Sequence, residues 1–541
     1  MKHCIIVWGC TSGAGKSLLA TALCRWAANR GVDVAPFKAQ NMSNNARVVP
    51  AWDGRDGGDG FEGAAGEIGS AQYFQALAAR QSATVDMNPV LLKPEADTRC
   101  QVVVHGRVEP ALAQMPWRER AGVLAQAAQA AFERLAARHE VIVIEGAGSP
   151  AETNLADGDY VNLGAARWAL AHAQAPASAS ASARRAPHTA AVQALLVADI
   201  DSGGAFAHCL GTWTLLPPDL RPLLAGFVLN KFRGDAGLLA PAPADLQRAT
   251  GVPVLGVLPM WREHGLPDED GLMAAPPLPP PSAAGSPAVA LRIAVIAPPH
   301  LSNLDEFQPL QQQPGVALSW VREPAALEGV HWIVLPGSKQ VSSDLAWLRT
   351  RGLDAAVRAF AAAGRPVLGI CGGLQMLGAL LSDPEGVDGE AHGALPGLGL
   401  LPLATTYAAP KQLRRTSASF AADLQGSWAA LAGVPFSGYE IRCGRIEPLP
   451  PTHTADSAPQ THQAHQAHPP HAALIAEGGQ VIGWSAGSVL GIHAHGLFES
   501  PAVQRALFGA PGVPLDHRLD NLAAWLEQHL GQARLAALFG L

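Results

Sequence analysis

The chain of 541 residues has little charge, few cysteines and no long apolar run, and each shortage excludes a class of protein. Only 15% of the residues are charged and the net charge is -7, so the basic excess of a nucleic-acid or membrane-surface binder is absent. The seven cysteines are irregularly spaced, which excludes a disulfide framework or a paired C-x-x-C metal site. No stretch reaches the roughly 18 apolar residues of a membrane span, and "CIIVW" near the start is too short for a signal peptide. The composition predicts a cytoplasmic protein.

The order of predicted secondary structure indicates two α/β domains. A chain of 541 residues exceeds one ordinary hydrophobic core, and short β-branched runs alternate along it with longer helical patterns. This alternation predicts parallel sheets built from βαβ units, and the fold class is therefore α/β with two doubly wound domains. The predicted strands form two series, at 4–8, 32–37, 141–146, 194–199, 226–230 and 254–259, and at 292–297, 332–337, 366–371 and 489–493.

An uncharged proline- and alanine-rich stretch, "AAPPLPPPSAAGSPA", separates the two series of strands. A stretch of this composition cannot bury enough apolar surface to order itself, so it predicts an interdomain linker at 274–290. The predicted domains are residues 1–273 before the linker and residues 291–541 after it.

Three further low-complexity stretches predict loop insertions, at 53–66, 173–190 and 452–471. The last contains five histidines, which are typical either of a metal-binding tract or of a solvated loop. The stretch lacks hydrophobic flanks and fixed carboxylate or thiol partners, which favours the loop. The histidines are His453, His462, His465, His468 and His471.

The sequence "GCTSGAGKS" at 9–17 follows the first predicted strand and precedes a helical pattern. A phosphate-binding loop has this setting, although the usual G-x-x-x-x-G-K-[ST] spacing is one residue longer here. In such a loop, backbone N–H groups hold phosphate oxygens, the lysine neutralises the β- and γ-phosphates, and the hydroxyl reaches Mg²⁺. An ordinary glycine-rich turn is the alternative, which G-K-S at the helix start disfavours. The predicted nucleotide contacts are Gly9, Thr11, Ser12, Gly13, Gly15, Lys16 and Ser17.

Polar residues follow several predicted strands of the first series. The carboxyl ends of parallel strands meet at the edge where open α/β sheets bind ligands, and Glu145, Asp199, Asp201 and Asn230 all lie at such ends. Each acid alone fits a strand-end cap equally well. Together with the phosphate loop they predict one Mg·nucleotide edge, with Ser17 and Glu145 as Mg²⁺ ligands and Asn230 contacting the base.

The second series contains a candidate nucleophile in "VLGICGGLQMLG". Cys371 follows an apolar strand, precedes a helix and has glycine neighbours, which is typical of a nucleophile elbow. The helix N-terminus favours the reactive thiolate, and backbone N–H groups beside it can hold an oxyanion. The alternative, a buried small hydrophobic residue, suits the other cysteines better. The thiol needs a base, and "GIHAHGLFE" supplies His493 and His495 just after a strand.

Segments from both halves together resemble one enzyme family. The lengthened phosphate loop is similar to that of the dethiobiotin synthetase-like ATP-dependent synthases. The segments "PFKAQNM", "GEIGSAQ", "TVDMNPVLLKP", "VIEGAGSPAETNL", "VADIDSGGAFA" and "LNKFRGD" resemble, in order, those of the adenosylcobyric acid synthase family, and "PPHLSNLDEFQPL" resembles the opening of its second half. The resemblance implies a dethiobiotin synthetase-like P-loop domain fused to a flavodoxin-like class I glutamine amidotransferase domain.

The resemblance also implies roles in the second half. The family's H-G-[LI]-F motif matches "HGLF" and selects His495 over His493 as the partner of Cys371. "LPGSKQVSSDLAWLR" is similar to the segment beside the family's glutamine site, which implies a second oxyanion contact from Gly337–Ser338. In "GYEIRCGRI", Arg442 stands where the family has histidine.

The third member of the Cys–His arrangement stays open. Ordinary class I glutamine amidotransferases have a glutamate two residues after the histidine, and this chain has Leu497 at that position. Glu440 and Glu499 are the two candidates.

The family resemblance implies an amidoligase that uses ATP, Mg²⁺ and glutamine. The expected reaction amidates the b, d, e and g carboxylates of adenosylcobyrinic acid a,c-diamide and gives adenosylcobyric acid in cobalamin biosynthesis. One alternative is cobyrinic acid a,c-diamide synthase, which has the same architecture. An alternative of another class is a ParA-like switch ATPase, which predicts no glutaminase. The expected partners are small molecules (corrinoid, ATP and glutamine), with no nucleic acid and no membrane.

Overall fold

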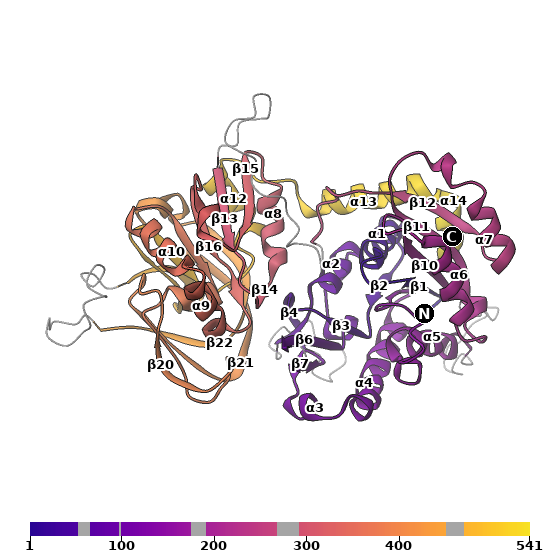
Figure 1. Cartoon of the computed structure of the whole chain (residues 1–541), viewed down its shortest axis with the longest axis horizontal. Helices are drawn as coiled ribbons and strands as arrows, with labels where there is room; N and C mark the ends of the chain where they lie inside the picture. Colours follow the sequence, from indigo (N-terminus) through magenta and orange to yellow (C-terminus); the bar gives the residue numbers. More distant parts are fainter. Residues whose placement is uncertain (52–64, 97–98, 175–190, 268–290, 451–469) are drawn as a thin grey trace. The chain divides into compact units, whose positions relative to one another are not determined.

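The computed structural model describes residues 1–51, 65–96, 99–174, 191–267, 291–450 and 470–541 (Figure 1). Two compact units account for the chain, and neither is one continuous stretch of sequence. Unit 1 comprises Met1–Ser43, Val49–Leu266 and Pro514–Leu541, and unit 2 comprises Asn44–Val48 and Pro267–Val513.

A parallel sheet of six strands forms the centre of unit 1, in the order β12-β11-β10-β1-β9-β2. All five neighbouring pairs run parallel, which confirms the six strands predicted in the first half. In chain order they are β1 (His3–Gly9), β2 (Val34–Phe37), β9 (Val141–Glu145), β10 (Ala191–Asp199), β11 (Leu224–Phe232) and β12 (Val254–Pro259).

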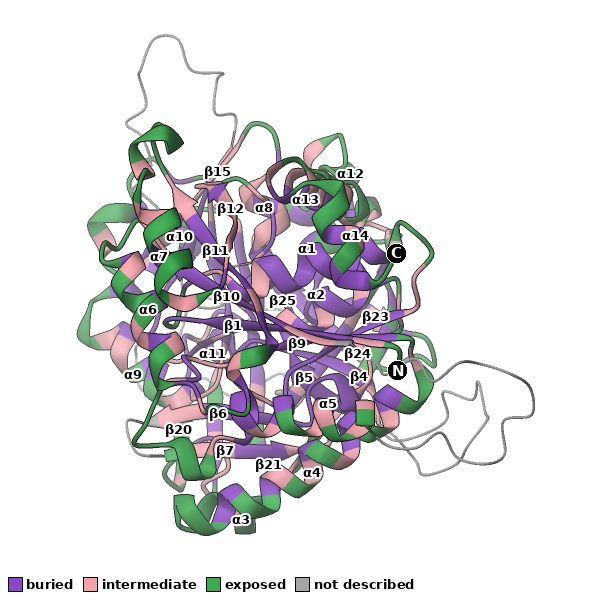
Figure 2. Cartoon of the chain, turned by 90° about the vertical axis from the view of Figure 1, so that its right-hand side faces the viewer, coloured by how far each residue is buried: buried purple, intermediate pink, exposed green. Residues whose placement is uncertain are grey.

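Side chains of β1 alternate between two hydrophobic cores, one on each face of this sheet, because successive strand residues point in opposite directions. Ile6 and Trp8 pack with residues of α4–α7, whereas Ile5 and Val7 pack with residues of α1, α13 and α14. The domain is therefore doubly wound, and its central strands are buried (Figure 2). The helices are α1 (Lys16–Ala28), α2 (Ser70–Ala78), α3 (Pro110–Gln114), α4 (Trp117–Arg138), α5 (Ala165–Gln174), α6 (Ala205–Leu215), α7 (Ala242–Thr250), α13 (Leu515–Leu530) and α14 (Gln532–Phe539).

A smaller sheet in the order β3-β6-β7-β8 also belongs to unit 1. Its first strand follows β2 after a short turn, so the "KAQNM" segment runs from one sheet into the other. The bounds are β3 (Gln40–Met42), β6 (Val90–Ala96), β7 (Arg99–Val104) and β8 (Arg107–Val108), and between them lie β4 (Ala46–Pro50) and β5 (Ala65–Gly69).

The chain's last helices differ from the predicted domain division, which placed all of 291–541 in one domain. Helices α13 and α14 (yellow in Figure 1) pack beside α1 in unit 1. Trp26 donates from its indole nitrogen to Glu527 at 2.7 Å, and Arg25 donates from Nε to Asp520 at 2.7 Å. The predicted domain boundary differs because the sequence of an amphipathic helix shows that one face is buried but does not show which surface covers that face.

Unit 2 is built on a mixed sheet of eleven strands, in the order β15-β13-β16-β18-β25-β24-β23-β21-β19-β20 with β22 paired to β21. Neighbours from β15 to β25 are parallel, and these include the four strands predicted in the second half. The bounds are β13 (Leu291–Ile296), β15 (Val316–Val321), β16 (Trp332–Leu335), β18 (Val367–Ile370), β19 (Leu380–Asp383), β20 (His392–Pro396), β21 (Leu403–Phe420), β22 (Pro435–Pro448), β23 (His471–Ala476), β24 (Val481–Ala486) and β25 (Val489–Ile492).

The parallel part of this sheet is also covered on both faces. Ala294 and Ile296 of β13 pack with residues of α9, α10 and α11, and Ile293 and Val295 pack with residues of α8 and α12. The bounds are α8 (Gln308–Gln311), α9 (Val341–Thr350), α10 (Leu353–Ala362), α11 (Gly372–Leu377) and α12 (Pro501–Phe508), and two short strands, β14 (Leu301–Ser302) and β17 (Gly337–Ser338), pair with each other.

The predicted linker at 274–290 and most of the three predicted insertions lie outside the described residues. Of the five histidines in the last insertion only His471 is described, and its ring nitrogen lies 3.1 Å from an Asp423 carboxylate oxygen. Across the described ranges, no helix is both long and apolar enough to cross a bilayer.

Because α13 closes one face of the first sheet, shortening a side chain at that contact destabilises unit 1. Leu526 is fully buried there. We expect Leu526→Ala to lower the free energy of unfolding of unit 1 by about 2–5 kcal/mol, measured by urea denaturation. The matched control, Leu238→Ala, removes a side chain that is 82% exposed and changes stability by less than about 0.5 kcal/mol. Equal effects of the two substitutions would contradict the packing described here.

Candidate active sites

The phosphate loop joins β1 to α1 at the carboxyl end of the central strand. Lys16 is buried, and its ammonium nitrogen donates to the Thr11 carbonyl oxygen at 2.9 Å and to the Gly148 carbonyl oxygen at 3.0 Å. Lys16 therefore spans the loop and the segment that follows β9. In a phosphate loop, a lysine at this position meets phosphate oxygens.

Gly15 shows why the loop needs glycine beside its lysine. Its φ is +98°, which lies in the left-handed region that favours glycine. A Cβ atom there would also lie 2.0 Å from the side-chain nitrogen of Asn230. That nitrogen donates to the Ala14 carbonyl oxygen at 2.9 Å. Asn230 is buried against the loop and supports its backbone, and its predicted contact with the base stays a prediction.

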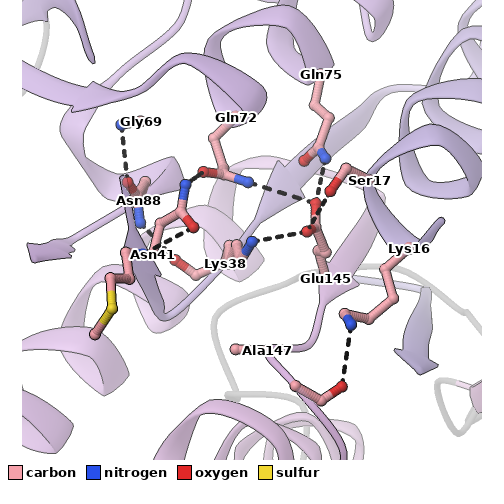
Figure 3. Close-up of polar contacts among 12 residues, drawn as sticks. Lys16, Ser17, Lys38, Asn41, Gly69, Gln72, Gln75, Asn88, Glu145 and Ala147 are labelled. Carbon is pink, nitrogen blue, oxygen red and sulfur yellow. Dashed lines mark hydrogen bonds and ion pairs between the residues drawn. The ribbon is translucent and has the colours of Figure 1, made fainter. Parts of the chain in front are cut away.

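Glu145 is the centre of a buried polar cluster at the end of β9 (Figure 3). The Ser17 hydroxyl and the Lys38 ammonium each donate to one carboxylate oxygen at 2.8 Å. Gln75 and Gln72, both on α2, donate to the other oxygen. The sequence placed Ser17 and Glu145 at one site, and the structure brings them into contact.

The surroundings of Glu145 keep its carboxylate charged. Burial by itself raises the pKa of Glu145, but the Lys38 ammonium and the hydrogen bonds from Lys38, Gln75 and Ser17 lower it below its ordinary value. A hydroxyl and a charged carboxylate in contact fit the oxygen donors that Mg²⁺ prefers. In the described part of the chain, no group of three or more His, Cys, Asp or Glu side chains has the arrangement of a metal site. Mg²⁺ held here would take its other ligands from phosphate and water.

The two aspartates at the end of β10 lie in ion pairs of their own. Asp199 accepts from Lys231 at 3.0 Å, and Arg233 forms an ion pair with Asp201. Asp199 also accepts from the backbone N–H groups of Asp201 and Ser202, as a strand-end cap does. These contacts fit the strand-end caps that the sequence left open as the alternative.

Cys371 occupies a strained turn between β18 and α11. Its φ is +51°, which is uncommon for a residue with a side chain and costs free energy that the surrounding packing must offset. Its backbone N–H donates to the Ile492 carbonyl oxygen at 2.8 Å, and its sulfur lies 3.5 Å from the Ile441 carbonyl oxygen. The thiol is thus held at the turn from both sides, as the predicted nucleophile elbow requires.

The glycines after Cys371 allow another segment to approach the turn closely. A Cβ atom on Gly372 would lie 2.7 Å from the Ser338 backbone nitrogen, and one on Gly373 would lie 1.9 Å from the Leu335 carbonyl oxygen. The Gly337–Ser338 strand, predicted as an oxyanion contact, therefore lies against the residue that follows the thiol. The Ser338 backbone nitrogen thus lies close to the turn that carries Cys371, and its predicted role as an oxyanion donor stays a prediction.

His495 lies beside this turn, and Glu306 orients its ring. The Nδ1 atom of His495 is 2.9 Å from a Glu306 carboxylate oxygen, and the Gly496 backbone N–H donates to the other oxygen at 3.0 Å. Both side chains are buried. Burial by itself lowers the pKa of His495. The negative charges of Glu306 and Cys371, and the hydrogen bonds to both residues, raise this pKa to about 10. The imidazole is held with Nδ1 toward Glu306, which leaves its other nitrogen for the thiol.

Neither candidate for the third member lies at His495. Glu440 accepts hydrogen bonds from Thr416 at 3.0 Å and from the Nε of Arg442 at 2.9 Å, and it also pairs with Arg414. Glu499 accepts from Arg47 at 3.0 Å. Both predictions are wrong because a triad is a spatial arrangement, and Glu306 reaches the histidine from 189 residues earlier in the chain.

His493 occupies a different environment from His495. It is buried edge-on against Trp484, with ring centroids 5.8 Å apart. Burial, with the nearby cations Arg442 and Arg414, holds the pKa of His493 well below its ordinary value. The preference for His495 as the partner of Cys371 agrees with this geometry.

Four side chains that contact the predicted site residues escaped the sequence prediction: Lys38, Gln72, Gln75 and Glu306. Lys38 lies in "PFKAQNM" and Gln72 in "GEIGSAQ", two segments that carry the family resemblance without pointing to any one side chain, and Gln75 lies three residues beyond the second segment. Lys38 directly follows a predicted strand, and this was a usable signal, because Glu145 was selected for its place at the end of another predicted strand. Glu306 lies in "PPHLSNLDEFQPL" beside another acidic residue, and no local pattern distinguishes it.

Comparisons with known proteins match one domain family to each half of the chain. A family model described as "CobQ/CobB/MinD/ParA nucleotide binding domain" matches residues 5–265, and one described as "CobB/CobQ-like glutamine amidotransferase domain" matches residues 292–503. The chain is similar to proteins named "Cobyric acid synthase" from Leptothrix cholodnii, at 56% identity over 99% of this chain and 96% of that one, and from Methylibium petroleiphilum, at 54% over 99% and 96%. The one from Acidovorax ebreus is 54% identical over 99% of each chain.

The fold, the two sites and these matches define an ATP-dependent amidating enzyme that hydrolyses glutamine. More narrowly, the chain belongs to the cobyric acid synthase family.

The contact between Glu306 and His495 predicts a specific defect. Glu306→Gln keeps the size of the side chain but removes its charge, so the pKa of His495 falls from about 10 toward its ordinary value. By analogy with carboxylate-to-amide changes in other triads, we expect the kcat of glutamine hydrolysis to fall by about 10²–10⁴-fold. Release of glutamate from glutamine measures this rate. The control Glu477→Gln changes an exposed residue and keeps the wild-type rate. A Glu306→Gln enzyme as fast as wild type would show that Glu306 has no part in the chemistry.

Proposed function

We propose that this chain amidates the b, d, e and g carboxylates of adenosylcobyrinic acid a,c-diamide and so makes adenosylcobyric acid in cobalamin biosynthesis. Glutamine supplies the nitrogen and MgATP activates each carboxylate. The observation that carries the proposal is the presence of two sites in one chain. In one site, Ser17 of the phosphate loop donates a hydrogen bond to Glu145. In the other, Cys371 lies at a strained turn and His495 contacts Glu306.

The substrate is supported by the relatives rather than by a corrinoid contact. Proteins named "Cobyric acid synthase" match essentially the full chain at more than half of their positions. Cobyrinic acid a,c-diamide synthase, the nearest alternative, shares the architecture, and the number of amides added to each corrinoid distinguishes the two enzymes. A ParA-like switch ATPase has no use for the Cys371 elbow.

In the ATP half, a substrate carboxylate oxygen attacks the γ-phosphorus, an acyl phosphate forms and ADP leaves. Ammonia then displaces phosphate to give the amide. Lys16 would meet the β- and γ-phosphates, and Ser17 and Glu145 would hold Mg²⁺. When bound, Mg²⁺ neutralises charge that develops on the phosphate oxygens. Lys38, Gln72 and Gln75 keep Glu145 charged and fixed in orientation.

In the glutamine half, the Cys371 thiol gives its proton to His495, its sulfur attacks the side-chain amide carbon of glutamine, and backbone N–H groups of the turn stabilise the oxyanion. His495 donates a proton to the departing nitrogen, so ammonia leaves and a glutamyl thioester remains. Water, deprotonated by His495, hydrolyses the thioester to glutamate and restores the thiol. Glu306 keeps the imidazole in the required orientation throughout.

A cytoplasmic location is part of the proposal. All seven cysteines are free thiols, which suits a reducing compartment. The partners are the three small molecules of the reaction.

The decisive test is mass spectrometry of adenosylcobyrinic acid a,c-diamide after incubation with enzyme, MgATP and amide-labelled glutamine. The wild-type enzyme adds four labelled amides. Cys371→Ala adds none from glutamine but regains activity with ammonium, because only the glutaminase is lost. Cobyrinic acid is the control substrate, and amidation of its a and c positions instead would transfer the chain to the a,c-diamide synthases. No mass change with either nitrogen source would overturn the proposal.

The ATP half predicts the opposite pattern of rescue. Glu145→Gln removes the charge at the centre of the buried cluster. We therefore expect the rate of amidation to fall by about 10²-fold or more, both with glutamine and with ammonium as the nitrogen source. The Mg²⁺ concentration needed for half-maximal rate rises as well. Arg167→Ala serves as a control, because that residue pairs with Asp219 on the exposed surface of the same unit. Rescue of Glu145→Gln by ammonium would contradict the role given to Glu145.

A further inference from the structure

The short 3₁₀ turn that carries Glu306 is held by residues from far earlier in the chain. The turn spans Leu304–Phe307, and its first backbone N–H donates to the side-chain oxygen of Asn45 at 2.9 Å. The preceding residue, Asn303, accepts from the Ala46 backbone N–H at 3.2 Å. Asn45 and Ala46 belong to Asn44–Val48, a segment of unit 2 that interrupts the sequence of unit 1.

Arg47, in the same segment, forms ion pairs with two carboxylates, one beside Glu306 and one just after the histidine motif. Its Nε donates to Asp305, the neighbour of Glu306, at 2.7 Å. Its guanidinium also donates to Glu499, four residues after His495, at 3.0 Å. Arg47 therefore joins the turn that carries Glu306 to the segment that carries His495.

Arg47 also touches the ring that stacks on His495. Its guanidinium carbon lies 5.0 Å from the Tyr439 ring centroid. The Tyr439 ring in turn stacks on the His495 imidazole, with centroids 5.3 Å apart and planes inclined by 21°. Glu306 thus fixes the imidazole at its Nδ1, and Tyr439 fixes one face of the ring. Arg47 contacts Tyr439 itself and also Asp305, the neighbour of Glu306.

Burial makes this arrangement sensitive to the loss of one charge. Arg47, Asp305 and Glu306 are all almost fully buried. A buried carboxylate that loses its cation is left uncompensated, which is more costly than loss of an exposed pair. Removal of Arg47 would therefore displace Asp305, and the adjacent Glu306 would lose its fixed position.

We propose that Arg47 is a positioning residue of the glutaminase, and that Asn44–Val48 is part of that site although its sequence lies in the nucleotide-binding half. The inference rests on the proposed function. Arg47 orients Glu306 and Tyr439, and through them His495, without touching glutamine. A positioning role affects the turnover of glutamine and leaves amidation from ammonium intact.

The test compares Arg47→Ala, Arg47→Lys and the wild type in the full-length enzyme. Glutamate release gives kcat and KM for glutamine, and ammonium-supported amidation of the corrinoid is measured in parallel. We expect Arg47→Ala to lower kcat by about 10–100-fold, with KM changed less than about threefold and the ammonium reaction within about twofold of wild type. Arg47→Lys keeps the charge but loses the bidentate geometry, so its kcat lies between those of Arg47→Ala and the wild type. Arg351→Ala is the matched control, because that arginine forms an exposed ion pair with Glu323 in the same unit.

Each contrary outcome is distinct. A kcat unchanged in Arg47→Ala overturns the inference, and so does an equal loss of the glutamine and ammonium reactions, which would give Arg47 a role in overall folding only. If Arg47→Ala does not fold, Arg47→Lys decides alone, and a wild-type kcat in that variant overturns the inference. Absence of glutaminase activity from the wild-type enzyme would instead overturn the proposed function.

Discussion

Both candidate sites depend on the fact that parallel strands in one sheet end at a common edge. In unit 1, Phe37 lies level with Ile144 and Val7 lies level with Glu145. The residues just beyond these strands, including Lys38 and the phosphate loop, therefore converge on Glu145. In unit 2, Ile370 lies level with Ile492, which places Cys371 beside the strand that leads to His495. Without this register, the residues of neither site would meet.

At each site the edge brings buried charges together, and neighbouring groups keep those charges in place. Glu145 remains a carboxylate because an ammonium and several neutral donors surround it. His495 favours its protonated form because Glu306 offsets the loss of solvent. In a medium of low polarity such pairs interact strongly, and they are costly to leave incomplete. This explains why residues that hold such a charge in place, such as Gln75 beside Glu145, are part of the sites.

The strands of both parallel sheets were predictable, because β-branched runs of about four to eight residues between turn signals are typical of buried strands and are too short for most helices. The nucleophile and the phosphate loop were predictable for a related reason. Each is a local motif whose chemistry requires neighbours in sequence: glycines beside Cys371 for a strained turn, and Gly15–Lys16–Ser17 for a strand-to-helix loop. The domain limits were less predictable, since α13 and α14 pack in unit 1 and Asn44–Val48 in unit 2.

The sequence by itself indicated the groups to which we assign the chemistry: a thiol at a turn, a histidine after a late strand, and a lysine and a hydroxyl in a glycine-rich loop. Only the tertiary structure decided which other groups complete them. Glu306 rather than Glu440 or Glu499 orients His495, and Lys38 with two glutamines surrounds Glu145. The physical reason is that hydrogen bonds and ion pairs act over a few ångströms in space. When two residues lie far apart in the chain, no periodicity or spacing in the sequence indicates that they are in contact.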